Sequence, residues 1–179
     1  MGGIELKKML ICLILLIATL SGCGLGASQQ MPIELYSGKP LHIAVIGELP
    51  EVELEQVKFN TISFQELENI NTISSAYDAV WIMNSQFDIA DQERYVEVYT
   101  ALSIPIFFIG TKKSYLPFVF EDMTYNDAPD IPGDYVAGYL QIDQEQFQFW
   151  GFELNDNEVT ERNVLDAYMR IFTVISELQ

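Results

Sequence analysis

The chain has 179 residues, of which 49% are hydrophobic and 12% aromatic, enough to fill the core of one domain. This composition excludes a disordered or fibrous protein. With 26 acidic against 9 basic residues, the net charge is -17, so the chain lacks the basic surface that nucleic-acid binding needs. Two cysteines and one histidine exclude a disulfide-dense scaffold, a Cys/His zinc site and most histidine-based triads.

The amino terminus has the pattern of a secretory signal. Residues 1–8 end in Lys7 and Lys8, and Met9 to Leu20 contain no charge. These are the basic and apolar regions of a signal peptide. A helix of about twelve residues rises about 18 Å, against about 30 Å for a hydrocarbon core, so the pattern favours a cleaved signal over a permanent span.

The apolar run ends in Leu20-Ser21-Gly22-Cys23, and this part of the chain resembles bacterial lipoproteins, whose lipobox is an aliphatic residue, two small residues and a cysteine. The resemblance covers residues 1–23. It implies cleavage after Gly22, a diacylglycerol thioether on Cys23, and anchoring at the extracytoplasmic face of the cell membrane. The alternative is an ordinary secretory signal with a chance cysteine. Two acyl chains hold a protein on a membrane stably, whereas the acidic body repels an anionic lipid surface.

Three segments follow from composition: a signal peptide at 1–22, the lipidated cysteine with a flexible tether at 23–40, and a single domain at 41–179. The tether is rich in small and polar residues, ends in turn formers, and shows neither a helical nor an alternating period. Beyond it we find no internal repeat and no second shift in composition, so one domain is expected.

Strands and helices alternate in the first part of this domain. In chain order we expect a strand at 41–47, a strand at 58–64, a helix at 65–76, a strand at 78–84, a helix from an Asp88 cap to Leu102, and a strand at 104–110. The strands are nearly continuous apolar runs, which is typical of a parallel sheet covered on both faces.

The order changes after Gly110. Residues 114–134 read as a loop, 135–142 and 147–154 as an antiparallel pair of strands, and a helix capped by Asn155 or Asn157 runs to Leu178. The predicted fold class is α/β: a three-layer, mostly parallel, flavodoxin/Rossmann-like sheet flanked by helices, with an antiparallel hairpin near the C-terminus and a C-terminal helix.

Ligands of open α/β sheets bind outside the carboxyl ends of the strands. The candidate ligand-binding residues at these ends are Glu48, Asn84, Ser85, Thr111 and Lys112. A carboxylate, an amide, hydroxyls and an ammonium group there suit a small polar ligand. The alternative is that they are ordinary loop residues, because every such domain has polar residues at these ends.

The arrangement also resembles a response-regulator receiver domain, with Glu48 and Thr111 in place, but Asn84 stands where the phosphorylated aspartate must be. Phosphate-loop and nucleophile-elbow patterns are absent. Acids between Glu121 and Asp134 suit Ca²⁺, but their spacing does not fit an EF-hand. We therefore predict no catalytic set, no cofactor and no metal.

Aromatic residues concentrate in the second half of the chain. They include Tyr115, Phe118, Phe120, Tyr125, Tyr135, Tyr139, Phe147, Phe149, Trp150 and Phe152. Most are expected in the core, and an excess beside the hairpin is a candidate recognition surface. The leading hypothesis is a non-enzymatic, lipid-anchored module that binds an envelope protein or a small ligand. The alternatives are an envelope hydrolase that uses carboxylates with a divalent cation, and a purely structural envelope component.

Overall fold

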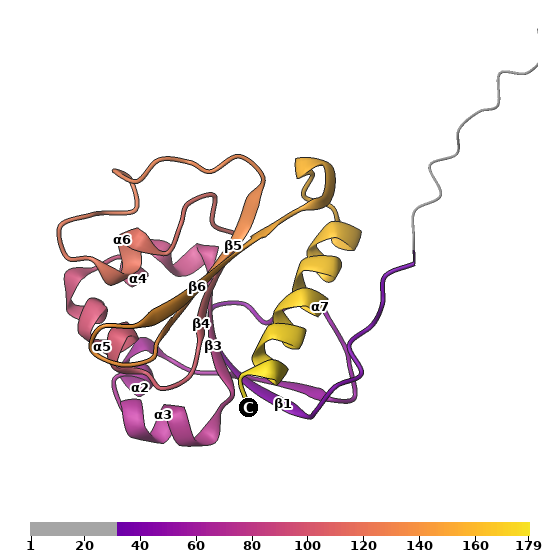
Figure 1. Cartoon of the computed structure of the whole chain (residues 1–179), viewed down its shortest axis with the longest axis horizontal. Coiled ribbons are helices and arrows are strands. Elements are labelled where there is room, and N and C mark those ends of the chain that lie inside the picture. Colours follow the sequence, from indigo (N-terminus) through magenta and orange to yellow (C-terminus); the bar gives the residue numbers. More distant parts are fainter. Residues whose placement is uncertain (1–31) are drawn as a thin grey trace, which may run out of the picture. The chain divides into compact units, whose positions relative to one another are not determined.

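The computed structural model describes residues 32–179 and shows an α/β fold built on one six-stranded sheet, in the order β2-β1-β3-β4-β5-β6 (Figure 1). Its strands are β1 (Leu41–Ile46), β2 (Val57–Thr61), β3 (Ala79–Met83), β4 (Ile106–Ile109), β5 (Asp134–Gln141) and β6 (Phe147–Glu153). The first four run parallel, and β5 and β6 form an antiparallel hairpin on β4. The predicted fold class is confirmed.

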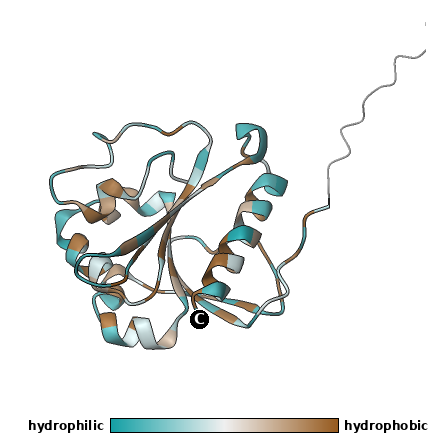
Figure 2. Cartoon of the chain, viewed as in Figure 1, coloured by the Kyte–Doolittle hydropathy of each residue, from teal (hydrophilic) through white to brown (hydrophobic). Residues whose placement is uncertain are grey.

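The helices divide unequally between the two faces of the sheet (Figure 1). One face is covered by α2 (Phe64–Leu67), α3 (Ile70–Ala76), α4 (Phe87–Ala90), α5 (Val96–Ala101) and α6 (Leu116–Val119). The other is covered by the long helix α7 (Glu161–Glu177). Hydrophobic and hydrophilic residues alternate along α7 (Figure 2), as expected of a helix with one buried face.

Alternate residues of the buried strands feed two separate cores, because successive strand side chains point to opposite faces. On the α7 side, the ring of Trp81 stacks on Phe172 at 5.5 Å and 5°. On the other side, Phe108 stacks on Phe118 at 3.7 Å and 7°. The indole Nε1 of Trp81 is buried without a hydrogen-bond partner among the described residues. Large rings therefore stack on both faces of the central strands and contribute to each core.

The helix predicted from Asp88 to Leu102 is interrupted. α4 ends at Ala90, Gln92 is extended at φ -71° and ψ 131°, and a 3₁₀ turn, η2 (Glu93–Tyr95), leads into α5. The Tyr99 hydroxyl donates to the Ala90 carbonyl at 2.9 Å, which satisfies a carbonyl that a continuous helix would have bonded. Asp88 lies inside the first turn of α4 and caps nothing.

Two other helix boundaries differ from the prediction. The helix expected at 65–76 is divided into α2 and α3, with Asn69 between them at φ -82° and ψ 60°. The last helix begins at Glu161, where the Thr160 side chain accepts the N–H of Asn163 at 3.2 Å. The predicted caps Asn155 and Asn157 instead form a 3₁₀ turn, η3 (Asn155–Asn157), next to the sheet edge. The short helix α6 occupies part of the predicted loop at 114–134.

The sequence placed residues 33–40 in the flexible tether, but the structure packs part of this segment against α7. Tyr36 is buried, its N–H donates to Met169 Sδ at 3.2 Å, and its ring lies 5.7 Å from that of Phe172. Residues 47–56, which connect β1 to β2, contain no helix that could cover this face of the sheet. Residues 33–36 pack there instead, beside α7. The compact unit therefore begins at Ile33.

Within residues 32–179, no helix has the length and apolar character needed to cross a membrane. The predicted signal peptide and the lipidation site Cys23 lie outside the described residues.

Candidate functional site

The predicted ligand-binding residues lie at the carboxyl ends of β1, β3 and β4, which are adjacent parallel strands and therefore end on the same side of the sheet. Gly110, at φ +82°, turns the chain away from β4, and a Cβ at this position would lie 3.0 Å from the Asn84 side chain. Glu48, Ser85 and Lys112 are exposed, as is Asn84. The three strand ends therefore lie side by side, and the Glu48 carboxylate and the Lys112 ammonium group are exposed to solvent.

Thr111 is fully buried, and its hydroxyl is occupied by its own loop. Its Oγ1 accepts the N–H of Lys113 at 3.0 Å and donates to the Lys113 carbonyl at 3.1 Å. The Tyr125 hydroxyl lies 3.3 Å from the same oxygen. Hydroxyls that bond the backbone two residues on stabilise turns. Thr111 thus holds the loop in place, and nothing in its contacts directs it toward a ligand.

Of the two lysines that follow β4, Lys113 rather than Lys112 is the one that points inward. Its Nζ lies 3.0 Å from Asp130 Oδ1, donates to the Ala128 carbonyl, and sits 5.3 Å from the centre of the Tyr125 ring. Its side chain is 12% exposed, whereas Lys112 is exposed. A buried ammonium group requires such partners, so Lys113 fastens the following loop to the strand ends.

Two of the acids considered as cation ligands hold the loop at 114–134 in place. Asp127 accepts the Thr124 hydroxyl at 2.6 Å, and Asp130 pairs with Lys113. Asp91, directly after α4, accepts the Tyr125 N–H at 2.9 Å. Among residues 32–179, no group of three or more His, Cys, Asp or Glu side chains is placed to hold a metal ion. These three carboxylates therefore serve as structural acceptors.

Asp134, at the start of β5, lies opposite Glu153 of β6. Burial raises the pKa of Asp134 above its usual 3.8, and the negative charge of Glu153 raises it further. The folded state therefore binds this proton more tightly than the unfolded state. Stability falls as pH rises from the unfolded pKa through the raised folded value, so the ionised carboxylate destabilises the protein at neutral pH.

We expect Asp134→Asn to raise the thermal unfolding midpoint at pH 7 by about 1–2 °C, because it removes this charge from beside Glu153. Differential scanning fluorimetry across pH checks this. The gain should shrink as the pH falls toward 3.8 and vanish well below it, where the wild-type carboxyl is neutral in both states. Asp122→Asn, at an exposed position of the preceding loop, should change nothing at any pH. A gain that does not depend on pH would exclude the charge as its cause.

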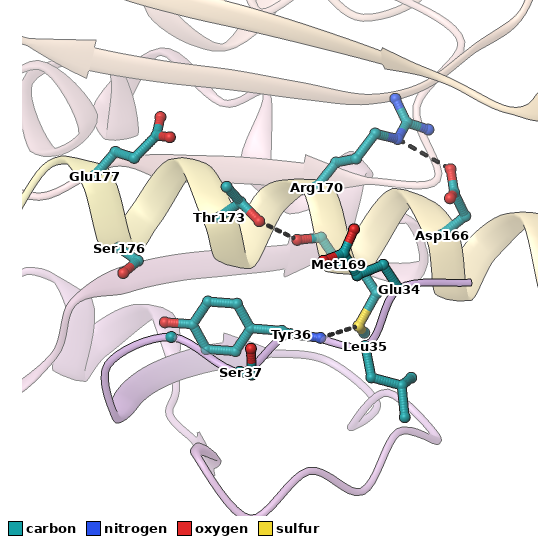
Figure 3. Close-up of a pocket in the computed structure, with 11 residues that line it drawn as sticks. Glu34, Leu35, Tyr36, Ser37, Asp166, Met169, Arg170, Thr173, Ser176 and Glu177 are labelled. Atoms are coloured by element: carbon teal, nitrogen blue, oxygen red, sulfur yellow. Dashed lines mark hydrogen bonds and ion pairs between the residues drawn. The ribbon is translucent and has the colours of Figure 1, made fainter. Parts of the chain in front are cut away.

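Two open pockets flank α7. One, of about 530 Å³, lies between residues 34–38 and the helix (Figure 3). Three of its polar side chains are bonded locally: Arg170 Nε lies 3.1 Å from Asp166 Oδ2, and the Thr173 hydroxyl donates to the Met169 carbonyl at 3.0 Å. These three side chains are already paired, and the buried side chains of the lining, Tyr36 and Met169, bond each other's segment rather than the pocket.

The second pocket, of about 770 Å³, lies at the start of α7 and is more apolar. Its lining includes Ile33, Val52, Val159, Val164, Leu165 and Tyr168. Burial raises the pKa of the Tyr168 hydroxyl, which also shares a hydrogen bond with Tyr135. That phenol therefore stays protonated and serves as a structural link between α7 and β5.

Two exposed rings of the hairpin, Phe147 and Phe149, lie over two buried rings, Tyr139 of β5 and Tyr115 at the start of α6; the four together are here called the hairpin aromatic surface. Phe147 and Phe149 are 44% and 59% exposed. Ring centroids lie 5.1 Å apart for Tyr115 and Phe149, 5.3 Å for Tyr115 and Tyr139, and 5.7 Å for Tyr139 and Phe147. On its other face β6 buries Phe152 in the α7-side core. Both faces of one strand are thus aromatic, and one remains in water.

β6 is also the outermost strand of the sheet, with no partner on its outer side among the described residues. Natural edge strands usually carry a lysine, a proline or a bulge that blocks further pairing. Residues 146–152 contain no charge and no proline, and the register irregularity of the hairpin lies at its far end, between Asp134 and Val136. By contrast, the opposite edge strand, β2, is shorter and carries Lys58.

Sequence reasoning found the aromatic concentration but not which rings are exposed. In β6, Phe147 and Phe149 lie on one face and Trp150 and Phe152 on the other, and only the structure shows that Phe147 and Phe149 remain exposed. Searches for relatives add nothing to this assignment, because no protein-family model, no curated protein and no solved structure matches the chain.

Proposed function

We propose that this protein is a lipid-anchored, extracytoplasmic module that binds a protein partner through the hairpin aromatic surface and the free edge of β6. The observation that carries the proposal is the combination of exposed Phe147 and Phe149 with an uncharged outer strand. Exposed aromatic patches are enriched at protein interfaces, and an open strand edge offers backbone hydrogen bonds to an added strand.

The amino-terminal sequence supports the location. A basic start, an apolar run and Leu20-Ser21-Gly22-Cys23 follow one another with the spacing of a lipoprotein signal. The lipid on Cys23 would keep the domain at the outer face of the cell membrane. A binding surface that faces other envelope proteins fits such an anchored domain.

Charge supports the choice of surface. The chain carries a net charge of -17, but residues 146–152 of the hairpin are uncharged. Interface cores are depleted of charged residues and enriched in aromatic ones. Contact along residues 146–152 therefore desolvates apolar surface and backbone groups of a stretch that carries no charge.

Small-ligand binding and hydrolysis at the strand ends have less support. The Thr111 hydroxyl and the Lys113 ammonium group are bonded within their own loop, and Glu48 is exposed. A catalytic or ligand-orienting group must lie in a site that holds the ligand, and it must not already be bonded to its own loop. We therefore place the function at the hairpin.

Site-specific photocrosslinking in intact membranes tests the proposal. A photoreactive residue at position 147 of the full-length protein should give a discrete adduct. Phe149→Lys should abolish that adduct, because a charge then lies in the centre of the patch. Leu49→Lys is the matched control, since Leu49 is 50% exposed, comparable with 59% for Phe149, and lies in the β1–β2 connection. Equal adduct with Phe149→Lys and wild type would contradict the proposal.

A further inference from the structure

The hydrogen-bond pattern of the hairpin shows which backbone groups of β6 are free. The Ile142 N–H donates to the Gln146 carbonyl at 2.9 Å, and the register then pairs Gln148 with Leu140 and Trp150 with Gly138. Bonded and non-bonded pairs alternate along an antiparallel ladder. The even-numbered residues therefore bond β5. The N–H and C=O groups that face outward belong to Phe147, Phe149, Gly151 and Glu153.

Among these four residues Gly151 is the one small residue, and it lies directly after Phe149 on the same face of the strand. Phe149 projects from the exposed face, whereas Gly151 leaves a gap: a Cβ there would have no neighbour closer than an Asp134 carboxylate oxygen at 3.5 Å. Aromatic side chains pack well across a strand pair onto a glycine. An antiparallel copy of the same strand places each Phe149 opposite a Gly151, so the edge is complementary to itself.

From this geometry we propose that the partner is a second copy of the chain. The inference rests on the proposed function and names the occupant of that site. The two β6 strands pair antiparallel about a two-fold axis at Trp150, perpendicular to the sheet, and the two sheets become one. Phe149 then faces Gly151 of the other copy, and Trp150 faces Trp150. Such an isologous contact is the commonest way in which identical chains associate.

The acidic residues choose this register over its neighbour. With the axis at Trp150, Glu153 lies opposite Phe147 of the other copy. With the axis at Phe149, Glu153 would lie opposite Glu145, and like charges directly opposite each other destabilise a strand pair. The axis at Trp150 also pairs all four outward-facing residues with residues of the other copy's β6. With the axis at Phe149, Glu153 has no partner within the other copy's β6, because Glu145 lies outside that strand.

The position of the amino-terminal segment fits two copies on one membrane. A two-fold axis perpendicular to the sheet keeps α7 of both copies on the same face of the joined sheet. The described compact unit begins at Ile33, in the segment that packs on α7. The described residues of both copies therefore begin on the same face of the joined sheet. Anchoring in one membrane also raises the effective concentration of each copy for the other.

A disulfide across the axis tests the register. Paired residues that are not hydrogen-bonded have Cα atoms about 4.5 Å apart, within the range that disulfides span. Trp150→Cys, in the full chain in its membrane, should give a reducible dimer under mild oxidation. Lys58→Cys, on the opposite edge, should not. The parent chain without an added cysteine shows whether Cys12 or Cys23 contributes.

Because Trp150 is partly buried beside Phe107, a second measurement is independent of that substitution. Light scattering of the detergent-solubilised wild type should give the mass of a dimer, and Phe149→Lys should weaken self-association by about tenfold or more. Leu49→Lys should leave it unchanged. Since each copy carries a net charge of -17, added salt should strengthen the dimer by screening repulsion.

The outcomes separate the two proposals. A monomeric wild type with no Trp150→Cys dimer overturns the second-copy inference. If position 147 then still gives a photoadduct that Phe149→Lys abolishes, with a mass other than twice that of the chain, the partner-binding function stands with another protein. If neither a dimer nor such an adduct forms, both proposals are wrong. Association that salt weakens would also overturn self-pairing, because it would indicate a basic partner.

Discussion

Replacing Cys23 by alanine is expected to abolish lipid attachment and cleavage after Gly22, and to release any chain that is still processed from the membrane. The thiol is the only group at this position that forms the thioether which the lipoprotein resemblance implies. Without it, the acidic chain of net charge -17 has no attraction to an anionic lipid surface. Each buried acyl CH₂ contributes about 0.8 kcal/mol, so loss of two chains removes nearly all membrane affinity.

Intact-mass spectrometry and detergent phase separation measure this change. Wild type should carry the mass of a diacylglycerol on a chain that begins at Cys23 and should enter the detergent phase. Cys12→Ala is the matched control, because Cys12 lies within the apolar run and should be removed with the signal. A cleaved Cys23→Ala chain that stays in the membrane would show that the anchor is not this lipid.

Replacing Phe172 by alanine is expected to lower the free energy of unfolding by about 3–5 kcal/mol, a large share of the roughly 5–15 kcal/mol typical of a domain. The Phe172 ring is fully buried and lies 5.5 Å from Trp81 of the sheet and 5.7 Å from Tyr36 of the amino-terminal segment. It therefore joins α7, the central strands and residues 33–38 at one point. The cavity left by alanine would loosen all three.

Urea unfolding of residues 33–179, followed by tryptophan fluorescence, checks this prediction, because Trp81 stacks directly on the lost ring. Phe149→Ala makes the same chemical change at a residue that is 59% exposed. It should alter stability by about 0.5 kcal/mol or less. Equal losses from the two variants would mean that the α7-side core does not hold the domain together.

The strands could be predicted from sequence because their signal is local and strong. A parallel strand buried on both faces must be apolar at nearly every position, and the runs ending at Gly47, Asn84 and Gly110 have this property. The hairpin was predictable for a similar reason, since two apolar stretches flank a short polar turn at 143–146. Its antiparallel pairing follows from the shortness of that turn.

The helix boundaries were less predictable because short helices depend on contacts that are distant in the sequence. The break after Ala90 is stabilised by a hydrogen bond from Tyr99, and Tyr99 also packs edge-on against Phe108 of β4 at 5.6 Å. Nothing in the local pattern distinguishes this arrangement from one continuous helix. The cap of α7 moved to Thr160 for a comparable reason, since several residues near that point can cap a helix.

The sequence by itself determined the alternation of strands and helices, the hairpin, the aromatic concentration and the lipoprotein pattern, because each depends on neighbouring residues. Only the tertiary structure decided that Thr111 and Lys113 serve their own loop, that Tyr36 packs on α7, and that Phe147 and Phe149 stay in water. The exposure of a side chain depends on whether distant segments of the chain pack over it. The order of the strands, with β6 outermost, leaves these two rings uncovered, and strand order is not written in any local pattern.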